Sequence, residues 1–297
     1  MATNIELHEE LLGGLEELST SPPLTLPWGL PPNLSVAQAA KATRRSLNLS
    51  DTDPVPQVLH SLETAGIVVV PVGFDMTDVK HDAYTFWTGE FGERPVIFLR
   101  HIDSWERTRW SAAHELGHLV LHRHRERGDD DLEAEANAFA NEFLVPGDQL
   151  RAEWPRVVTL STLITLKMRW RMSLQSLIKH GEGLGLLDAE RVSGLYKQLS
   201  ARLDPETGQS WRRKEPGWSS ESPERPQLLA AMFEAANNQP ATAKRLARVA
   251  GGWAPDVLSG FDVNDVELSS TVVAVEPENI VGAVSIRSNV IAFGRRR

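Results

Sequence analysis

Short apolar runs come first along the chain and runs of helical period follow, and this order predicts the fold class. Three apolar runs have the length and β-branched content of strands: 67–72, 82–87 and 95–100. From Ser104 the period becomes helical, and a second helix is expected at 132–145, where Pro146 ends it. Strands followed by helices predict an α+β fold in which a short sheet packs with helices.

Composition divides the chain into five segments. Residues 1–54 combine a short acidic helix, a proline-rich stretch and a further helix, and the compact α+β domain is expected at 55–155. Residues 156–205 are predicted to form three locally basic helices with helix-turn-helix-like spacing. A polar linker is expected at 206–225, and helices followed by short strands at 226–297.

The 297-residue chain contains no cysteine, which excludes a disulfide scaffold, a cysteine-ligated zinc finger, an iron–sulfur protein and a thiol nucleophile. Its formal net charge of −9 indicates that the molecule as a whole is not a basic nucleic-acid binder. The first residues carry acids where a signal peptide needs bases. No apolar run approaches the roughly 18 residues of a membrane span. We therefore expect a cytoplasmic protein without a membrane partner.

The strongest chemical signal is the run HELGH at 114–118. On a helix, His114 and His118 lie one turn apart on one face, so that two imidazoles can reach one zinc ion. Glu115, beside the first histidine, is placed to accept a proton from water. A chance match is the alternative, but the apolar flanks favour a metal helix. Gly117 costs about 1 kcal/mol in mid-helix, which predicts close packing of another element there.

A catalytic zinc site needs a third protein ligand, and the next helix offers four candidates: Glu133, Glu135, Asn137 and Glu142. We choose Glu133, because Asn137 then shares its face and can bond a ligand histidine. Glu135 is turned by about 200° from Glu133. The alternative is that Glu133 is solvated and that 129–131, or no residue, completes the site. His122 is expected to cap the end of the first helix.

Together, SWERTRWSAAHELGHLVLH (104–122) and LEAEANAFANEFLVP (132–146) resemble the ImmA/IrrE family of zinc metallopeptidases. The family shows an arginine-bearing lead-in, AHELGH, a following LH, and an ExxAN-FA segment. Three positions depart from this pattern: Trp110 stands where Phe is usual, Asn141 where Ala is usual, and Val145 where Met is usual. None of them is a metal position. Both motifs occur in order with a short gap, which makes the resemblance specific.

The resemblance covers 57–150 strongly, and 160–218 resembles the helical region of longer members. Residues 1–50 are too short and proline-rich for the N-terminal repressor-like helix-turn-helix domain that such members often carry. The resemblance implies a zincin-like catalytic domain with a gluzincin-like site. In that site His114, His118 and Glu133 bind Zn²⁺, and Glu115 acts as general base. Characterised relatives cleave a transcriptional repressor, which implies a zinc-dependent endopeptidase with such a protein substrate.

The segment 156–180 has five bases and no acid, which favours docking of an acidic partner surface on Lys167, Arg169 and Arg171. A DNA-binding regulator whose zinc site is structural or vestigial is the alternative. Nucleic acid is possible as a partner but less favoured, because the molecule is acidic. Four residues have the right type for a further transition-state donor: Tyr84, His81, His101 and Arg109. The sequence does not indicate an oligomeric state.

Overall fold

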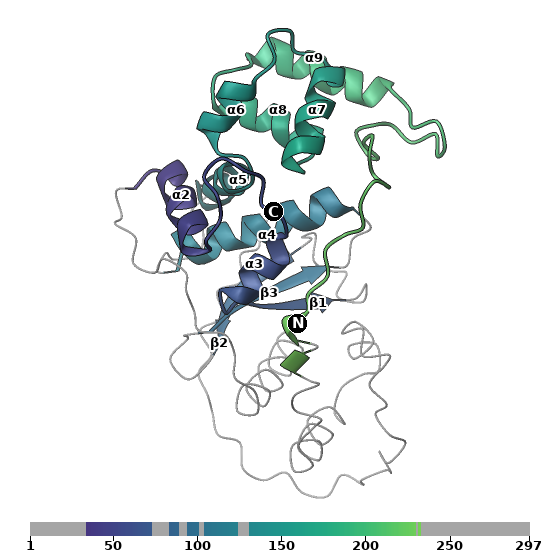
Figure 1. The fold of residues 1–297 in the computed structure, drawn as a ribbon. Helices are drawn as coiled ribbons and strands as arrows, with labels where there is room; N and C mark the ends of the chain where they lie inside the picture. The colour runs from purple at the N-terminus through teal and green to yellow at the C-terminus, as the bar shows by residue number, and fades with distance from the viewer. Residues whose placement is uncertain are drawn as a thin grey trace, which may run out of the picture. The chain divides into compact units, whose positions relative to one another are not determined.

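A computed structural model of the 297-residue chain describes residues 34–72, 83–88, 94–100, 104–123, 131–229 and 231–232. These residues belong to two compact units. The sheet unit holds the described residues within 62–101 and from 226 onward, and the helical unit holds those within 25–61 and 102–225 (Figure 1). The helix predicted at the N-terminus and the strands predicted at the C-terminus lie outside the described residues.

The helical unit contains seven helices among its described residues: α2 (Val36–Ser46), α4 (Trp105–Leu121), α5 (Asp131–Leu144), α6 (Gly147–Glu153), α7 (Leu160–Trp170), α8 (Leu174–Gly183) and α9 (Ala189–Ala201). Helix α3 (Val58–Thr64) crosses the boundary between the units. Five N-cap side chains in the described residues each accept a backbone N–H from the first turn: Ser35, Ser104, Thr159, Ser173 and Asp188. These caps explain where the helices begin.

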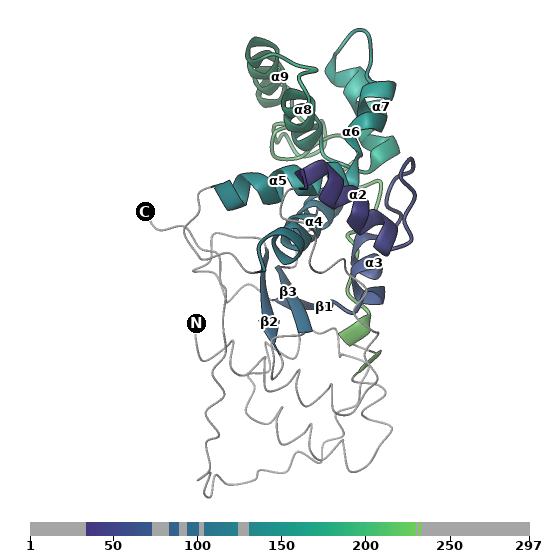
Figure 2. The ribbon, with the colours of Figure 1, turned by 90° about the vertical axis from the view of Figure 1, so that its left-hand side faces the viewer.

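Helices α4 and α5 form the centre of the helical unit, and α2 and α8 pack against α5 (Figure 2). Gly117 allows the close approach of α4 and α5. A Cβ atom at this position would lie 3.1 Å from Cδ1 of Phe139 and 3.2 Å from Cα of Ala136. The contact confirms the prediction that another element packs closely against the metal helix.

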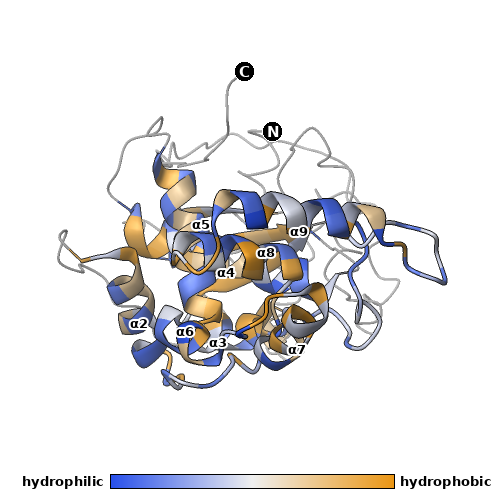
Figure 3. Ribbon diagram, turned by 90° about the horizontal axis from the view of Figure 1, so that it is seen from above, coloured by the Kyte–Doolittle hydropathy of each residue, from blue (hydrophilic) through white to orange (hydrophobic). Residues whose placement is uncertain are grey.

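Helices α7, α8 and α9 pack against one another and continue the helical unit beyond α5. Each of these helices carries both apolar and polar residues, and the buried ones are mainly apolar (Figure 3). In α7 the buried face includes Leu160, Leu163 and Trp170. Because α8 contacts α5, the predicted basic helical region belongs to the same unit as the metal helix.

The sheet unit contains a three-stranded sheet among its described residues. Strand β3 (Arg94–Arg100) lies between β1 (Val68–Val72), to which it is parallel, and β2 (Ala83–Thr88), to which it is antiparallel. Phe98 faces Val70 on one side and Tyr84 on the other. The ring of Tyr84 stacks on that of Phe98 with centroids 4.7 Å apart.

The predicted α+β class is confirmed, and each predicted strand occurs within one or two residues of its expected place. The division into five segments stays a prediction. No helix in the described parts of the chain is long and apolar enough to cross a membrane.

Candidate metal centre

Two histidines of α4 face the same point. Ser104 caps the helix and sets its start, so that His114 and His118 lie one turn apart. Their Nε2 atoms are 3.1 Å apart. The remainder of the helix is anchored by buried apolar residues: Ala112, Ala113, Leu116 and Leu119. Packing of these residues therefore fixes the part of the helix from which the two imidazoles project.

Glu133, in the first turns of α5, completes the group. Its carboxylate oxygens lie 3.5 Å from Nε2 of His114 and 3.4 Å from Nε2 of His118. The three side chains place their donor atoms within 4.8 Å of one another, as a metal site requires. Glu142, a rival candidate, instead accepts the backbone N–H of Gly147 at 2.9 Å. Of the other rival acids, Asp131 is exposed, and 129–130 lie outside the described residues.

The spacing of these donor atoms fits a tetrahedral metal ion. Ligand atoms about 2.0–2.2 Å from zinc in tetrahedral geometry lie about 3.3–3.6 Å apart, and the three observed separations are 3.1, 3.4 and 3.5 Å. Hydrogen bonds from the two histidines hold the pKa of Glu133 well below its usual range, so the carboxylate is ionised and can bind a cation. Two imidazoles and one carboxylate leave a fourth position open.

Glu115 is buried beside the two histidines, with 6% of its surface exposed. Burial raises the pKa of its carboxyl to about 7; His114 opposes this rise in pKa and Glu133 adds to it. A carboxyl that exchanges a proton near neutral pH suits general acid–base chemistry.

The ring of His114 also contacts residues outside the donor group. Burial works to lower the pKa of His114, but hydrogen bonding to Glu133, the charges of Glu115 and Glu133, and the amide of Asn137 raise it overall. The Nδ1 atom of His114 has no hydrogen-bond partner in the described part of the chain. The supporting role that we assign to Asn137 therefore stays a prediction. Trp110 stacks on His114 with ring centroids 5.2 Å apart.

His122 occupies the C-cap position of α4, and its ring contacts His118 and Glu135. Its Nδ1 lies 2.9 Å from Nδ1 of His118, and its Nε2 lies 3.0 Å from a carboxylate oxygen of Glu135. The expected position of His122 at the end of the helix is confirmed, and the contacts of its ring with His118 and Glu135 were not predicted. Glu135 points away from the metal donors yet is joined to them through His122. The four-residue spacing of 114, 118 and 122 was the available sequence signal.

The three predicted docking residues do not form a free basic surface. Lys167 is fully buried and pairs with Glu106 and with Glu215, the latter at 3.0 Å, so its expected exposure is wrong. Arg169 pairs with Glu153 at 2.9 Å, and Arg171 pairs with Glu221. A partner that binds the two arginines must compete with these acids. Docking at Arg169 and Arg171 stays a prediction.

Of the four residues considered as hydrogen-bond donors to the transition state, the structure describes Arg109 and Tyr84. Arg109 is fully buried and donates to Glu224 and to the carbonyl oxygen of Val55, so its guanidinium is committed to structure. Tyr84 belongs to the sheet unit, where its hydroxyl is buried without a hydrogen-bond partner among the described residues. Positions 81 and 101 lie outside the described residues.

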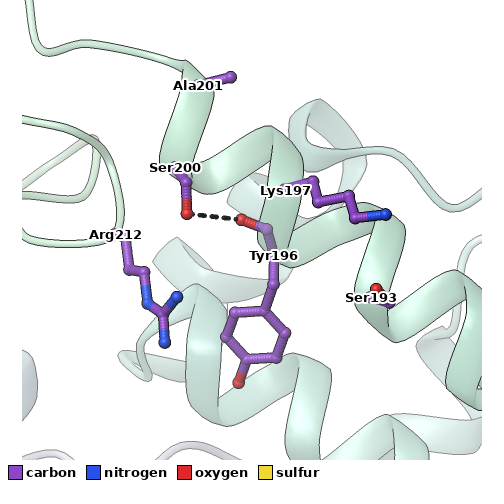
Figure 4. A pocket seen from close by; sticks show the side chains of 6 residues that line it. All are labelled: Ser193, Tyr196, Lys197, Ser200, Ala201 and Arg212. Carbon is purple, nitrogen blue, oxygen red and sulfur yellow. Dashed lines mark hydrogen bonds between the residues drawn. The ribbon is translucent and has the colours of Figure 1, made fainter.

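An open pocket elsewhere in the helical unit lies along α9 and is lined by Ser193, Tyr196, Lys197, Ser200, Ala201 and Arg212 (Figure 4). The Ser200 hydroxyl donates to the carbonyl oxygen of Tyr196 at 3.0 Å. The guanidinium of Arg212 lies 5.6 Å from the centroid of the Tyr196 ring. No residue of the metal centre lines this pocket, and its lining contains no acid.

The family comparison bears directly on the metal centre. Residues 62–180 match the family model of the IrrE N-terminal-like domain, Peptidase_M78. The matched span begins within α3, ends within α8 and contains the three donor side chains and Glu115. A search of curated proteins finds no match to the chain.

Proposed function

Because residues 62–180 form an IrrE N-terminal-like domain of the Peptidase_M78 family, we propose that the protein is a zinc-dependent endopeptidase. The family supports a metallopeptidase-like function and agrees with the resemblance found in the sequence. The convergence of His114, His118 and Glu133 beside the buried carboxyl of Glu115 carries the proposal. This is the arrangement that metal-assisted hydrolysis of a peptide bond needs.

In the proposed reaction, His114, His118 and Glu133 hold the zinc ion. When bound, zinc supplies acidification of a water molecule and polarisation of the scissile carbonyl. Glu115 accepts the proton of the attacking water and passes it to the leaving amine. The burial that raises the pKa of Glu115 makes its carboxylate a stronger base toward the attacking water.

For the substrate, we propose a specific cytoplasmic protein, namely a transcriptional repressor whose cleavage switches on a mobile element or a stress response. The support is the family resemblance, together with the long helical segment that follows α5 and carries no further cluster of donor side chains among its described residues. Arg169 and Arg171 remain the proposed contacts for acidic groups of this partner.

The DNA-binding alternative is less favoured. Lys167 is buried and the two neighbouring arginines are paired with acids, which leaves little free positive charge to bind phosphates. A steep fall of duplex affinity with salt would nevertheless support it.

The test combines metal analysis with cleavage. Protein purified without a polyhistidine tag should contain close to one equivalent of zinc, and His114→Ala and His118→Ala should empty the site. Glu115→Gln should keep the zinc but lose about 10²–10⁴-fold in cleavage of repressors encoded beside the gene, monitored by mass spectrometry. Glu190→Gln, at an exposed position of α9, is the matched control. Cleavage at the wild-type rate by Glu115→Gln would remove Glu115 from the mechanism.

A further inference from the structure

Behind His118 lies a hydrogen-bonded chain of two side chains. We propose that His122 and Glu135 fix the tautomer and the orientation of His118 and thereby set the metal affinity of the site. The inference rests on the metal centre of the proposed function. Its basis is two contacts in series: Nδ1 of His118 to Nδ1 of His122 at 2.9 Å, and Nε2 of His122 to Glu135 at 3.0 Å.

The positions of the protons follow from what each group can donate. A carboxylate only accepts, so Nε2 of His122 must carry the proton that is shared with Glu135. Nδ1 of a neutral His122 is then bare and accepts the proton on Nδ1 of His118. A metal ion that binds here displaces the proton that Nε2 of His118 shares with Glu133, and Nε2 then offers its lone pair to the ion. This is the tautomer that can bind a metal through Nε2.

Packing keeps the hydrogen-bonded side chains of His118, His122 and Glu135 in one arrangement. His122 is only 1% exposed, and its ring lies 5.0 Å from that of His118, centroid to centroid. Glu135 is two residues from Glu133 on α5, so the same helix supplies a carboxylate to the donor group and another to the chain behind it. A displacement of α5 would therefore disturb His118 through both routes.

The two ligand histidines differ in their support. Nδ1 of His118 has His122 as its partner, whereas Nδ1 of His114 is buried and has none in the described part of the chain. Partners of this kind raise the basicity of a ligand imidazole and hold its ring, and their loss typically costs about 10–100-fold in metal affinity. We therefore expect His118 to be the better-held ligand.

The zinc affinity of the full-length protein tests the role of His122 and Glu135 without reference to catalysis. The apo protein is titrated with zinc against a chromophoric chelator. His122→Phe keeps the ring shape but removes both nitrogens, and we expect it to weaken zinc binding about 10–100-fold. His122→Asn places an amide oxygen near the Nδ1 position, so it should restore part of the loss. Glu135→Ala should weaken binding, and Glu190→Ala, at an exposed site on α9, should not.

The tautomers of His118 and His122 can be measured directly, and a purely structural role of these residues would not change them. In ¹⁵N-histidine spectra of the zinc-loaded protein, we expect a bonded proton on Nδ1 of His118 and on Nε2 of His122, with a bare Nδ1 on His122. A proton on both nitrogens of His122 would overturn the proposal, because Nδ1 of His118 would then have to accept. Melting of the apo variants shows whether each one is folded.

Glu133→Ala distinguishes a failure of the His122–Glu135 contacts from a failure of the metal centre itself. If it abolishes zinc binding while His122→Phe and Glu135→Ala bind like the wild type, the chain is overturned and the metal centre stands. If the wild type binds no zinc, or binds it equally well without Glu133, both the centre and the chain are overturned.

Discussion

Trp110 and Asn141, two of the residues that depart from the family pattern, contact each other. The indole Nε1–H of Trp110 donates to Oδ1 of Asn141 at 3.1 Å, which joins α4 to α5. A phenylalanine at 110 would offer no donor, and an alanine at 141 would offer no acceptor. The two departures therefore supply the donor and the acceptor of one hydrogen bond, beside the candidate ligand His114, on whose ring the indole stacks.

This contact predicts non-additive effects on stability. Trp110→Phe and Asn141→Ala should each destabilise the fold, whereas the double variant should be less destabilised than the sum by about 0.5–1.5 kcal/mol. Urea unfolding of the wild type, both single variants and the double variant measures this coupling. Strict additivity would show that the hydrogen bond contributes nothing to stability.

At the scale of elements, the packing of α5 on α4 brings the carboxylate of Glu133 to the two histidines. Gly117→Ala gains up to about 1 kcal/mol of helix propensity. The added methyl must displace Phe139 and the backbone of Ala136, which lie 3.1–3.2 Å from its position. We expect a net change in unfolding free energy within about 1 kcal/mol. Zinc affinity should fall several-fold, because Glu133 lies one turn before Ala136 and moves with it.

Gly194→Ala in α9 is the matched control, since a Cβ atom there meets nothing within 4 Å. That variant should gain stability by up to about 1 kcal/mol and leave zinc binding unchanged in the same competition titration. If Gly117→Ala binds zinc as tightly as Gly194→Ala does, the spacing of the two helices does not limit the site.

In the sheet unit, Glu63 at the end of α3 predicts a pH-dependent stability. Burial raises the pKa of Glu63 to about 7, although its carboxylate accepts the backbone N–H groups of Gln227 and Leu228. The folded state therefore binds more protons than the unfolded state between about pH 4.5 and 7. This contribution to stability is present below that window and is lost as the pH rises through it.

Glu63→Gln removes the titrating group and keeps an oxygen acceptor. Relative to the wild type, the variant should gain about 1–3 kcal/mol of unfolding free energy when the pH is raised from 5 to 8. Urea unfolding of both proteins at the two pH values gives this difference, from which groups common to both cancel. A difference that does not change with pH would contradict the assignment.

At the scale of the whole molecule, one buried cluster joins distant parts of the helical unit. Lys167 of α7 contacts Glu106 of α4 and Glu215 of the segment after α9, and its ammonium lies 4.9 Å from the centroid of the Trp105 ring. Glu215 also accepts the backbone N–H groups of Leu174 and Gln175 at the start of α8. The charges are fully desolvated, so removal of one member leaves the others without compensation.

Lys167→Met should therefore lower the unfolding free energy by about 3–5 kcal/mol. Arg169→Met, which removes an exposed salt bridge on the same helix, should change it by less than about 1 kcal/mol. Chemical denaturation measures both. Equal effects would mean that Lys167 is not desolvated. Charge reversal to probe docking belongs at Arg169 and Arg171, because reversal at Lys167 would unfold the protein.

Local patterns were sufficient to predict the strands, helix α4 and the proximity of Glu133 to His114 and His118, because apolar runs and helical phase depend on neighbouring residues alone. They failed where a partner lies far along the chain. The segment around Lys167 contains no acid, and only folding brings Glu106 and Glu215 to it. The contact of the His122 ring with Glu135 was missed for the same reason, since Glu135 belongs to the next helix.

The position of Glu215 sets a lower limit on the length of an autonomous fragment. The family match ends at 180, but the carboxylate that neutralises Lys167 and caps α8 comes from residue 215. Arg109 depends on Glu224 in the same way. An expression fragment that ends at 180 would leave the buried cations Lys167 and Arg109 without Glu215 and Glu224. A fragment that continues to 225 would retain both carboxylates. The region that matches the family and the folding unit of this chain therefore do not share a C-terminal boundary.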